Sequence, residues 1–353
     1  MATSLNTAKS LPGSLATAQQ RIGGIKFDLF MVLLTSWFVG GLHLDGWAHS
    51  HIPQLETFFT PWHGVLYSGY GVCALAIVGV VVLNHRRGYV WRQAIPAGYE
   101  LSLLGVPLFF LGGIADLIWH LLFGIEANIE ALLSPTHLLL AFSGVLIVSG
   151  PFRAAWRRQD KNAQPGWAAL FPMLLSLLAT YSFFTFFTEY AHPFVRVSLV
   201  TFGSTDDMPK ALGIAGILLQ AGLLMGFVLL LVKRWRLPFG ALTLLLTVNT
   251  ALICVFSDQY RLVPAAFVAG LVADLLIAFL NPSPERHEVL RLFAFLVPLV
   301  LYLGYFSELM LLDGIAWSIH LWLGSCALAG IVGLVLSYLL VTPQRAAELE
   351  RIF

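Results

Sequence analysis

Long apolar stretches alternate with short polar ones along most of this chain. Pro, Gly and charged residues separate ten apolar stretches, each close to the roughly 20 residues that a helix needs to cross the hydrocarbon of a bilayer. The pattern therefore predicts an all-α integral membrane protein with about ten transmembrane helices. The predicted spans are 27–48, 62–84, 97–122, 134–151, 167–190, 211–232, 237–256, 263–281, 289–311 and 315–341.

The basic residues favour one orientation of these spans. If the N-terminus is cytoplasmic, all but three of the 20 Lys and Arg residues fall on the inner side, the exceptions being Arg196, Lys210 and Arg261. Cytoplasmic loops of membrane proteins carry such an excess. The alternation therefore predicts ten spans with both termini cytoplasmic, in a multi-pass protein of the plasma (inner) membrane.

The domain organisation follows from the same pattern. Residues 1–25 are rich in Ser, Thr, Ala and Gln and are expected to form a flexible cytoplasmic tail. No A-x-A-like cleavage site precedes the first apolar stretch, so it is expected to be a retained helix and not a signal peptide. Residues 26–341 form a single polytopic membrane domain, and 342–353 a cytoplasmic C-terminal tail.

Composition agrees with a membrane protein and narrows the chemistry. Apolar residues make up 58% and charged residues 11% of the 353 residues, against about 25% charged in soluble domains. The three cysteines are scattered singly, without CxxC spacing, which argues against a disulfide framework or a thiolate metal site. No basic tract indicates a nucleic-acid partner.

Histidine and acidic residues gather at the predicted outer ends of the helices. All ten histidines except His85 and His287 fall there. Two stretches share a pattern: HLDGWAHSHIPQLETFFTPWH (43–63) and DLIWHLLFGIEANIEALLSPTH (116–137). Each contains D-x-x-x-H and ends in E-x-x-x-[ST]-P-x-H. The likeness suggests an internal repeat of two helical hairpins, 26–84 and 97–151, a known way to build membrane proteins.

Each part of the shared pattern has a physical meaning. Residues four apart on a helix share a face, so the Asp and His of D-x-x-x-H can reach one ion. Thr60-Pro61 and Ser134-Pro135 are typical of a helix N-cap followed by proline in the first turn. The histidine two residues after each proline would lie in that first turn. The positive end of the helix dipole there favours neutral imidazole, the form that binds metals.

One further junction and one mid-span residue add candidates. Glu189 and His192 form E-x-x-H at the predicted outer end of the fifth span, a pairing found in carboxylate-bridged di-metal bundles. We expect them to act as a catalytic proton-transfer pair, or His192 as a ligand. Asp274 lies mid-span, where an ionisable group is either functional or protonated and hydrogen-bonded to a neighbouring helix.

Buried carboxylates without Lys or Arg partners imply a cation. Seven ligands are more than one tetrahedral zinc takes, so two ions are expected. Imidazole with carboxylate and no thiolate favours copper or iron, with zinc as an alternative. The predicted ligands are Asp45, His49, His63, Asp116, His120, His137 and His192, and the expected surrounding residues are His43, His51, Glu56, Glu130, Asp313 and His320.

The D-x-x-x-H motif with a later histidine resembles the copper-ligand arrangement in the C subunit of the copper membrane monooxygenases. The spacing differs: thirteen residues separate His49 from His63, and sixteen separate His120 from His137. The ten predicted spans and the duplication also depart from that family. The likeness covers a few residues and is an analogy of ligand chemistry.

The leading hypothesis is a membrane metalloenzyme, an oxidoreductase of monooxygenase type that acts on a lipophilic small molecule from the extracytoplasmic half of the bilayer. It needs an external electron donor or a bound quinone, because neither a dinucleotide-binding glycine motif nor a thiolate cluster occurs. A divalent-metal or copper transporter is the first alternative, with Asp274 and Glu100 lining the path inward. A zinc-dependent membrane hydrolase and a structural or sensory metalloprotein are the others. The sequence leaves open whether the chain forms a homo-oligomer.

Overall fold

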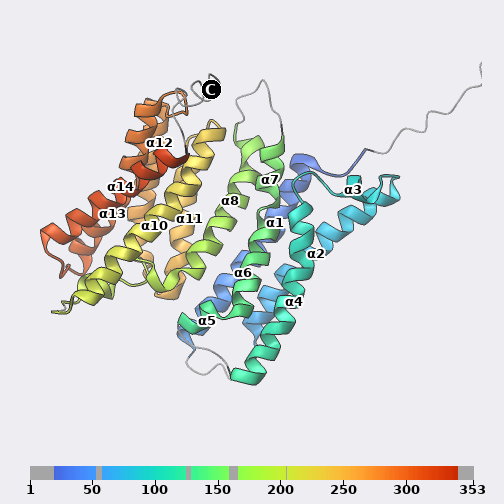
Figure 1. Cartoon of the computed structure of the whole chain (residues 1–353), viewed down its shortest axis with the longest axis horizontal. Helices are drawn as coiled ribbons and strands as arrows, with labels where there is room; N and C mark the ends of the chain where they lie inside the picture. Colours follow the sequence, from blue (N-terminus) through green and yellow to red (C-terminus); the bar gives the residue numbers. More distant parts are fainter. Residues whose placement is uncertain (1–19, 53–57, 125–128, 159–165, 204, 341–353) are drawn as a thin grey trace, which may run out of the picture.

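The computed structural model describes residues 20–52, 58–124, 129–158, 166–203 and 205–340. Within these ranges all regular structure is helical. The helices form two groups, with α8 (Trp167–Phe187) between them (Figure 1). Side chains of α8 contribute to the hydrophobic core of both groups.

The N-terminal group carries the two predicted hairpins. It consists of α1 (Gly24–His51), α2 (Pro61–Arg86), the short α3 (Trp91–Ala94), α4 (Glu100–Phe123), the short α5 (Ile129–Leu133), α6 (Pro135–Val148) and α7 (Gly150–Arg157).

The C-terminal group begins with two short elements, η1 (Glu189–Ala191) and α9 (Ser198–Thr201). It continues with α10 (Asp207–Arg234), α11 (Ala241–Ile253), η2 (Cys254–Phe256), η3 (Tyr260–Leu262), α12 (Val263–Leu280), α13 (His287–Leu312) and α14 (Ile319–Leu340).

Eight helices of the described chain are long and apolar enough to cross a membrane. A ninth span is obtained if α6 and α7, which meet at a bend of 42°, are counted together. The bend has a local cause, because Pro151 lacks the N–H that would bond to the carbonyl four residues earlier. The remaining predicted span corresponds to the shorter apolar helix Ala241–Phe256. The structure thus supports an all-α membrane-type protein, and the count of ten stays a prediction.

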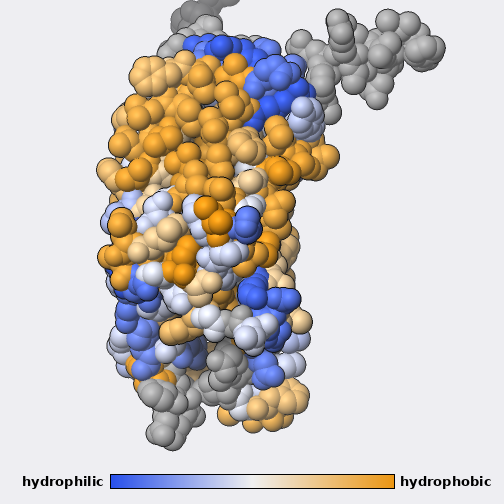
Figure 2. Space-filling model, turned by 90° about the vertical axis from the view of Figure 1, so that its left-hand side faces the viewer, coloured by the Kyte–Doolittle hydropathy of each residue, from blue (hydrophilic) through white to orange (hydrophobic). Residues whose placement is uncertain are grey.

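The surface agrees with this class of protein. Figure 2 shows a broad apolar band on the side of the molecule where α12, α13 and α14 lie, with hydrophilic residues gathered toward both ends. Exposed side chains such as Phe279 (82%) and Leu311 (86%) would cost free energy in water. Eight apolar helices and this band are compatible with a multi-pass membrane protein.

Basic side chains form hydrogen bonds among the helix ends that the sequence predicts to lie on the cytoplasmic side. Arg87 donates to the carbonyl of Gln20 (2.7 Å), and Arg153 Nε donates to the carbonyl of Gly98 (2.9 Å). Lys233 Nζ donates to the carbonyl of Leu340 (2.9 Å). We call this the basic end, and the opposite end, which carries Asp45 and Asp116 with their neighbouring histidines, the histidine-rich end. Which end faces the cytoplasm stays a prediction.

Glycines let α1 and α2 approach closely. A Cβ added at Gly41 would lie 2.8 Å from the Cα of Leu66, and one at Gly69 would lie 2.6 Å from the Cα of Phe38. Small residues at such crossings let the backbones of membrane helices touch. As a result, the short Asp45 side chain on α1 can meet the first turn of α2.

Candidate metal centre

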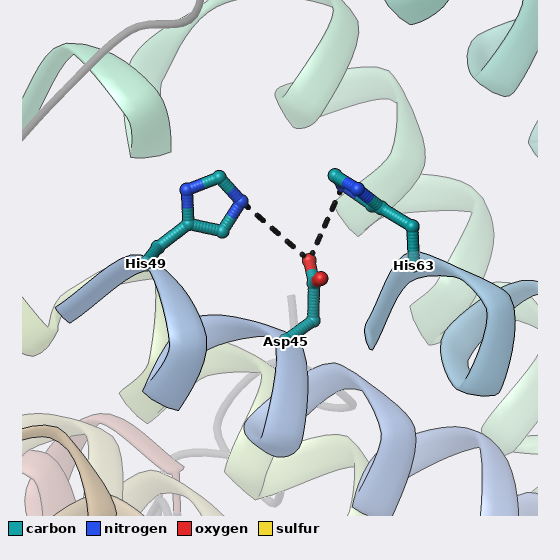
Figure 3. A group of neighbouring side chains, drawn as sticks. All are labelled: Asp45, His49 and His63. Carbon is teal, nitrogen blue, oxygen red and sulfur yellow. Dashed lines mark ion pairs between the residues drawn. The ribbon is translucent and has the colours of Figure 1, made fainter. Parts of the chain in front are cut away.

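The first group of ligating side chains joins the end of α1 to the start of α2. Asp45 and His49 lie one turn apart on α1, and His63 lies in the first turn of α2. The Nε2 atom of His63 is 3.4 Å from Asp45 Oδ2, and that of His49 is 3.9 Å from the same oxygen. Figure 3 shows both rings turned toward the carboxylate from opposite sides.

Helix capping fixes the orientation of His63. The Thr60 hydroxyl accepts a hydrogen bond from the backbone N–H of His63 (3.1 Å), and Pro61 is the first residue of α2. The same hydroxyl oxygen is 3.1 Å from His63 Nδ1. With Nδ1 engaged, Nε2 is the nitrogen that faces Asp45. The predicted N-cap is confirmed, and it also positions the ligand.

The second group repeats this arrangement at the junction of α4 and α6. Ser134 caps α6 by accepting from His137 N–H (3.4 Å), and its oxygen is 2.8 Å from His137 Nδ1. His137 Nε2 is 3.3 Å from Asp116 Oδ1, and His120 Nε2 is 3.6 Å from Asp116 Oδ2. The Thr136 hydroxyl donates to Asp116 Oδ1 (2.7 Å). The two groups share a local geometry, and an origin by duplication stays a proposal.

A hydrogen bond at Nδ1 orients the ring of His120. Its Nδ1 is 3.2 Å from the carbonyl oxygen of Gly124, which can only accept, so Nδ1 carries a proton. The Nε2 atom of His120 lies 3.6 Å from Asp116 Oδ2, where the imidazole and the carboxylate can share a proton or a metal ion.

The spacing within each group suits a metal ion. One ligand atom from each residue of a group lies within 4.8 Å of the other two. Two metal–ligand bonds of about 2.0–2.1 Å at a tetrahedral angle place their donor atoms roughly 3.3 Å apart. Asp45 Oδ1 is buried and has no hydrogen-bond partner, and in the described chain no Lys or Arg forms an ion pair with Asp45 or Asp116. Both groups therefore fit a cation.

Both groups line one cavity of about 460 Å³. Phe58 lies between them, its ring stacked on His63 at 5.0 Å and 6.0 Å from the ring of His120. Much of the remaining wall is apolar and aromatic, from Phe38, Leu42, Phe109, Leu132, Phe183, Phe186, Phe187 and Phe256. The arrangement places two polar groups that could bind metal on the wall of a largely apolar cavity.

Tyr67 is a cavity residue that the sequence analysis missed. It follows His63 by one turn of α2, and its ring centroid is 6.3 Å from that of His63. A Cβ added at Gly113 on α4 would lie 3.1 Å from the Tyr67 hydroxyl oxygen. Because Gly113 precedes Asp116 by three residues, Tyr67 reaches from one group toward the other. The H-x-x-x-Y spacing was the available signal, but it does not reveal that α2 packs on α4.

The side chains of Glu189 and His192 line different cavities. α8 ends at Phe187 and a single 3-10 turn follows, while His192 is extended because Pro193 comes next. Glu189 lines the large cavity, and burial raises its pKa, with Arg196 acting in the opposite direction. His192 lines a separate small cavity, where burial lowers its pKa to about 3, and Nδ1 accepts from Phe194 N–H (3.3 Å). His192 is therefore in neither ligand group.

The histidines expected around the ligands have other partners. His43 Nδ1 bonds to the carbonyl of Val39 (2.9 Å), and its buried ring packs edge-on against Phe186. His51 Nε2 is 3.0 Å from Asp258 Oδ2, which ties the end of α1 to the loop before α12. His320 is exposed in the first turn of α14.

The acidic residues expected around the ligands also lie elsewhere. Glu130 is exposed on α5. Asp313 pairs with Arg261 at 2.7 Å in the C-terminal group. Glu56 falls outside the described residues.

Asp274, the mid-span acid, has a structural role. Its carboxylate accepts from the backbone N–H groups of Leu242 (3.1 Å) and Thr243 (2.9 Å) and from the Thr243 hydroxyl (2.6 Å). It therefore caps the N-terminus of α11, where the helix dipole favours a negative charge.

Comparison with known protein families, with curated proteins and with solved structures gives no match to this chain.

Proposed function

We propose that this chain is a membrane metalloenzyme that holds two transition-metal ions, one in each Asp/His/His group, and oxidises a lipophilic small molecule in the shared cavity. The first ion would be held by Asp45, His49 and His63, and the second by Asp116, His120 and His137. The observation that carries the proposal is the grouping of one carboxylate and two imidazoles, with ligand atoms within 4.8 Å of one another, in a capping geometry that occurs twice.

The ligand type favours redox chemistry. Two histidines and one carboxylate leave coordination positions open, a set typical of non-haem iron oxygenases and also suited to copper. An iron or copper ion held this way supplies a redox centre with room for a small ligand. Because the chain has no dinucleotide-binding motif, electrons would come from an external donor or a quinol.

Other residues of the cavity would bind the substrate and transfer protons. The phenylalanine-rich wall excludes water and holds the apolar part of the substrate. Tyr67, between the two groups, can donate a hydrogen bond into the space that they face. Glu189, on the cavity wall with a raised pKa, can accept or release a proton. The site would open in the extracytoplasmic half of the bilayer, as the distribution of basic residues predicts.

The transport hypothesis receives less support. It predicts a polar path inward that includes Asp274 and Glu100. Asp274 is fully engaged in capping α11, and Glu100 pairs with Arg157 at the basic end (2.6 Å). A zinc hydrolase shares the ligand set and is separated from the redox proposal by the metal that the protein takes.

The test is a metal count followed by a turnover assay. The protein is purified in mild detergent, stripped with chelator, and reloaded separately with Fe²⁺, Cu²⁺ and Zn²⁺. We expect two ions per chain, and dioxygen consumption by the iron or copper form when a quinol and a lipophilic substrate are supplied. Fewer than one ion per chain would overturn the proposal. Two zinc ions with ester cleavage, and no dioxygen uptake with iron or copper, would identify a hydrolase instead.

A further inference from the structure

Three basic residues stand apart from the basic end, and one of them differs from the other two. Lys210 pairs with Asp207 (2.9 Å), and Arg261 pairs with Asp313 (2.7 Å). Arg196 forms no ion pair within 4.0 Å among the described residues. It instead lines the cavity that holds both ligand groups.

The local backbone directs Arg196 to this place. Its backbone N–H donates to the carbonyl of His192 (2.9 Å), in the turn that follows Pro193. Its Nε donates to the carbonyl of Tyr190 (3.1 Å), which fixes one edge of the guanidinium. Neither Nη atom forms a hydrogen bond within the described chain, so these donors remain available to a ligand.

The free Nη donors of the Arg196 guanidinium favour an anionic ligand. Glu189, the nearby acid, does not remove that preference. It lies more than 4.0 Å from Arg196, since the two form no ion pair, and burial raises its pKa. The guanidinium stays charged at every relevant pH. A neutral Glu189 leaves Arg196 with an uncompensated charge, and an ionised one disfavours a ligand that carries more than one negative charge.

The remaining wall of the cavity favours a ligand with an apolar body. Phe183, Phe186 and Phe187 from α8 and Phe256 from η2 line the same cavity as Arg196. Its volume of about 460 Å³ falls within the range of about 300–1,000 Å³ for small-molecule sites. A guanidinium matches the planar, bidentate geometry of a carboxylate.

We propose that the substrate is a lipophilic monocarboxylic acid, whose carboxylate binds the Arg196 guanidinium while its apolar body lies along the phenylalanine wall beside the metal groups. The inference rests on the proposed function, since it names the substrate of the same cavity. It adds a specificity-determining residue from outside the four ligand-bearing helices.

The test is a binding measurement on the full chain in phosphatidylcholine nanodiscs. Radiolabelled laurate is compared with dodecanol, which has the same chain length and no charge, and displaceable binding is counted. Arg196→Gln removes the proposed contact, Arg196→Lys keeps the charge, and Arg261→Gln is the matched control because Arg261 does not line the cavity. Metal content is measured in each sample, and binding is repeated after chelation.

Wild type is expected to bind laurate at least tenfold more tightly than dodecanol. Arg196→Gln should abolish that preference, as removal of a charge-assisted hydrogen bond costs about 10- to 100-fold. Arg196→Lys should retain part of it, and Arg261→Gln all of it. Equal binding of acid and alcohol, or the same preference in Arg196→Gln, overturns the inference even where two ions are bound. Arg196-dependent binding in a chain that takes up no metal supports the acid site and overturns the proposed enzyme.

Discussion

Three of the four buried aspartates in predicted spans, Asp45, Asp116 and Asp274, behave in two different ways. Asp274, in the C-terminal group, accepts two backbone N–H groups and a hydroxyl, and completes the end of a neighbouring helix. Asp45 and Asp116, in the N-terminal group, face imidazole nitrogens, and Asp45 also has an oxygen without a partner. All three carboxylates are buried, so burial alone does not distinguish structure from function.

The partners make the distinction. Backbone N–H groups at a helix start satisfy a carboxylate completely, and no ion is needed. Asp45 and Asp116 face imidazole nitrogens instead, which can share either a proton or a metal ion with the carboxylate. A buried acid is therefore informative only together with the hydrogen-bond state of its neighbours.

The largest effect should follow from neutralising the metal-facing aspartates. Asp45→Asn and Asp116→Asn keep the side-chain shape and remove the charge that draws the cation. Each single variant should retain one ion and the double variant none, as measured by elemental analysis after reloading. His320→Gln removes a histidine outside both groups and should retain two ions. Two ions in either aspartate variant would contradict the assignment of its group.

A change in helix packing should come next. Gly41→Ala places a methyl group 2.8 Å from the backbone of α2, so the helices must separate, at a cost of about 1–3 kcal/mol. His63 then moves away from Asp45, and the first ion should be lost while the second stays. Gly40→Ala is the matched control, because a Cβ there meets nothing within 4 Å. Thermal unfolding and metal content, measured on both variants, check the prediction; equal behaviour would contradict it.

A smaller effect is expected from a substitution that weakens metal binding in only one of the two groups. Thr136→Val removes the 2.7 Å hydrogen bond to Asp116 Oδ1. Loss of a hydrogen bond that orients a ligand typically weakens metal binding about 10- to 100-fold. Competitive titration with a chromophoric chelator should show one weakened site and one unchanged. Thr180→Val, a buried threonine that bonds only to the carbonyl of Ser176, should weaken neither.

The smallest effect on the ions is expected at Asp274. Asp274→Asn should leave both ions bound, because this carboxylate only caps α11. It should still lower the free energy of unfolding by about 1–3 kcal/mol, the cost of weakening hydrogen bonds to a charged group. Thermal unfolding in detergent together with a metal count checks both parts. Loss of an ion would mean that Asp274 belongs with Asp45 and Asp116 after all.

The helical fold class and both ligand groups were predictable from local patterns. Apolar stretches with polar punctuation predict helices, and D-x-x-x-H and [ST]-P-x-H are short enough for helix geometry to fix their side-chain directions. The span count is less accessible, since the break before Pro151 and the short α11 depend on what packs around them.

Features that depend on packing were not predictable in the same way. The E-x-x-H pattern at Glu189 and His192 predicted a shared helix face, but the helix ends before it and Pro193 turns the chain away. Tyr67 and Arg196 join the cavity through contacts between segments distant in the sequence. No periodicity along the chain encodes such contacts.

The cavity has walls from two parts of the chain. Every residue of the two ligand groups comes from α1, α2, α4 and α6, whereas Val195, Arg196 and Phe256 come from beyond α8. The Asp/His/His groups and the segment that carries Arg196 therefore face the same cavity from different parts of the chain. Under the proposed function, substitutions confined to residues 189–196 are expected to change which molecules bind while both Asp/His/His groups stay unchanged.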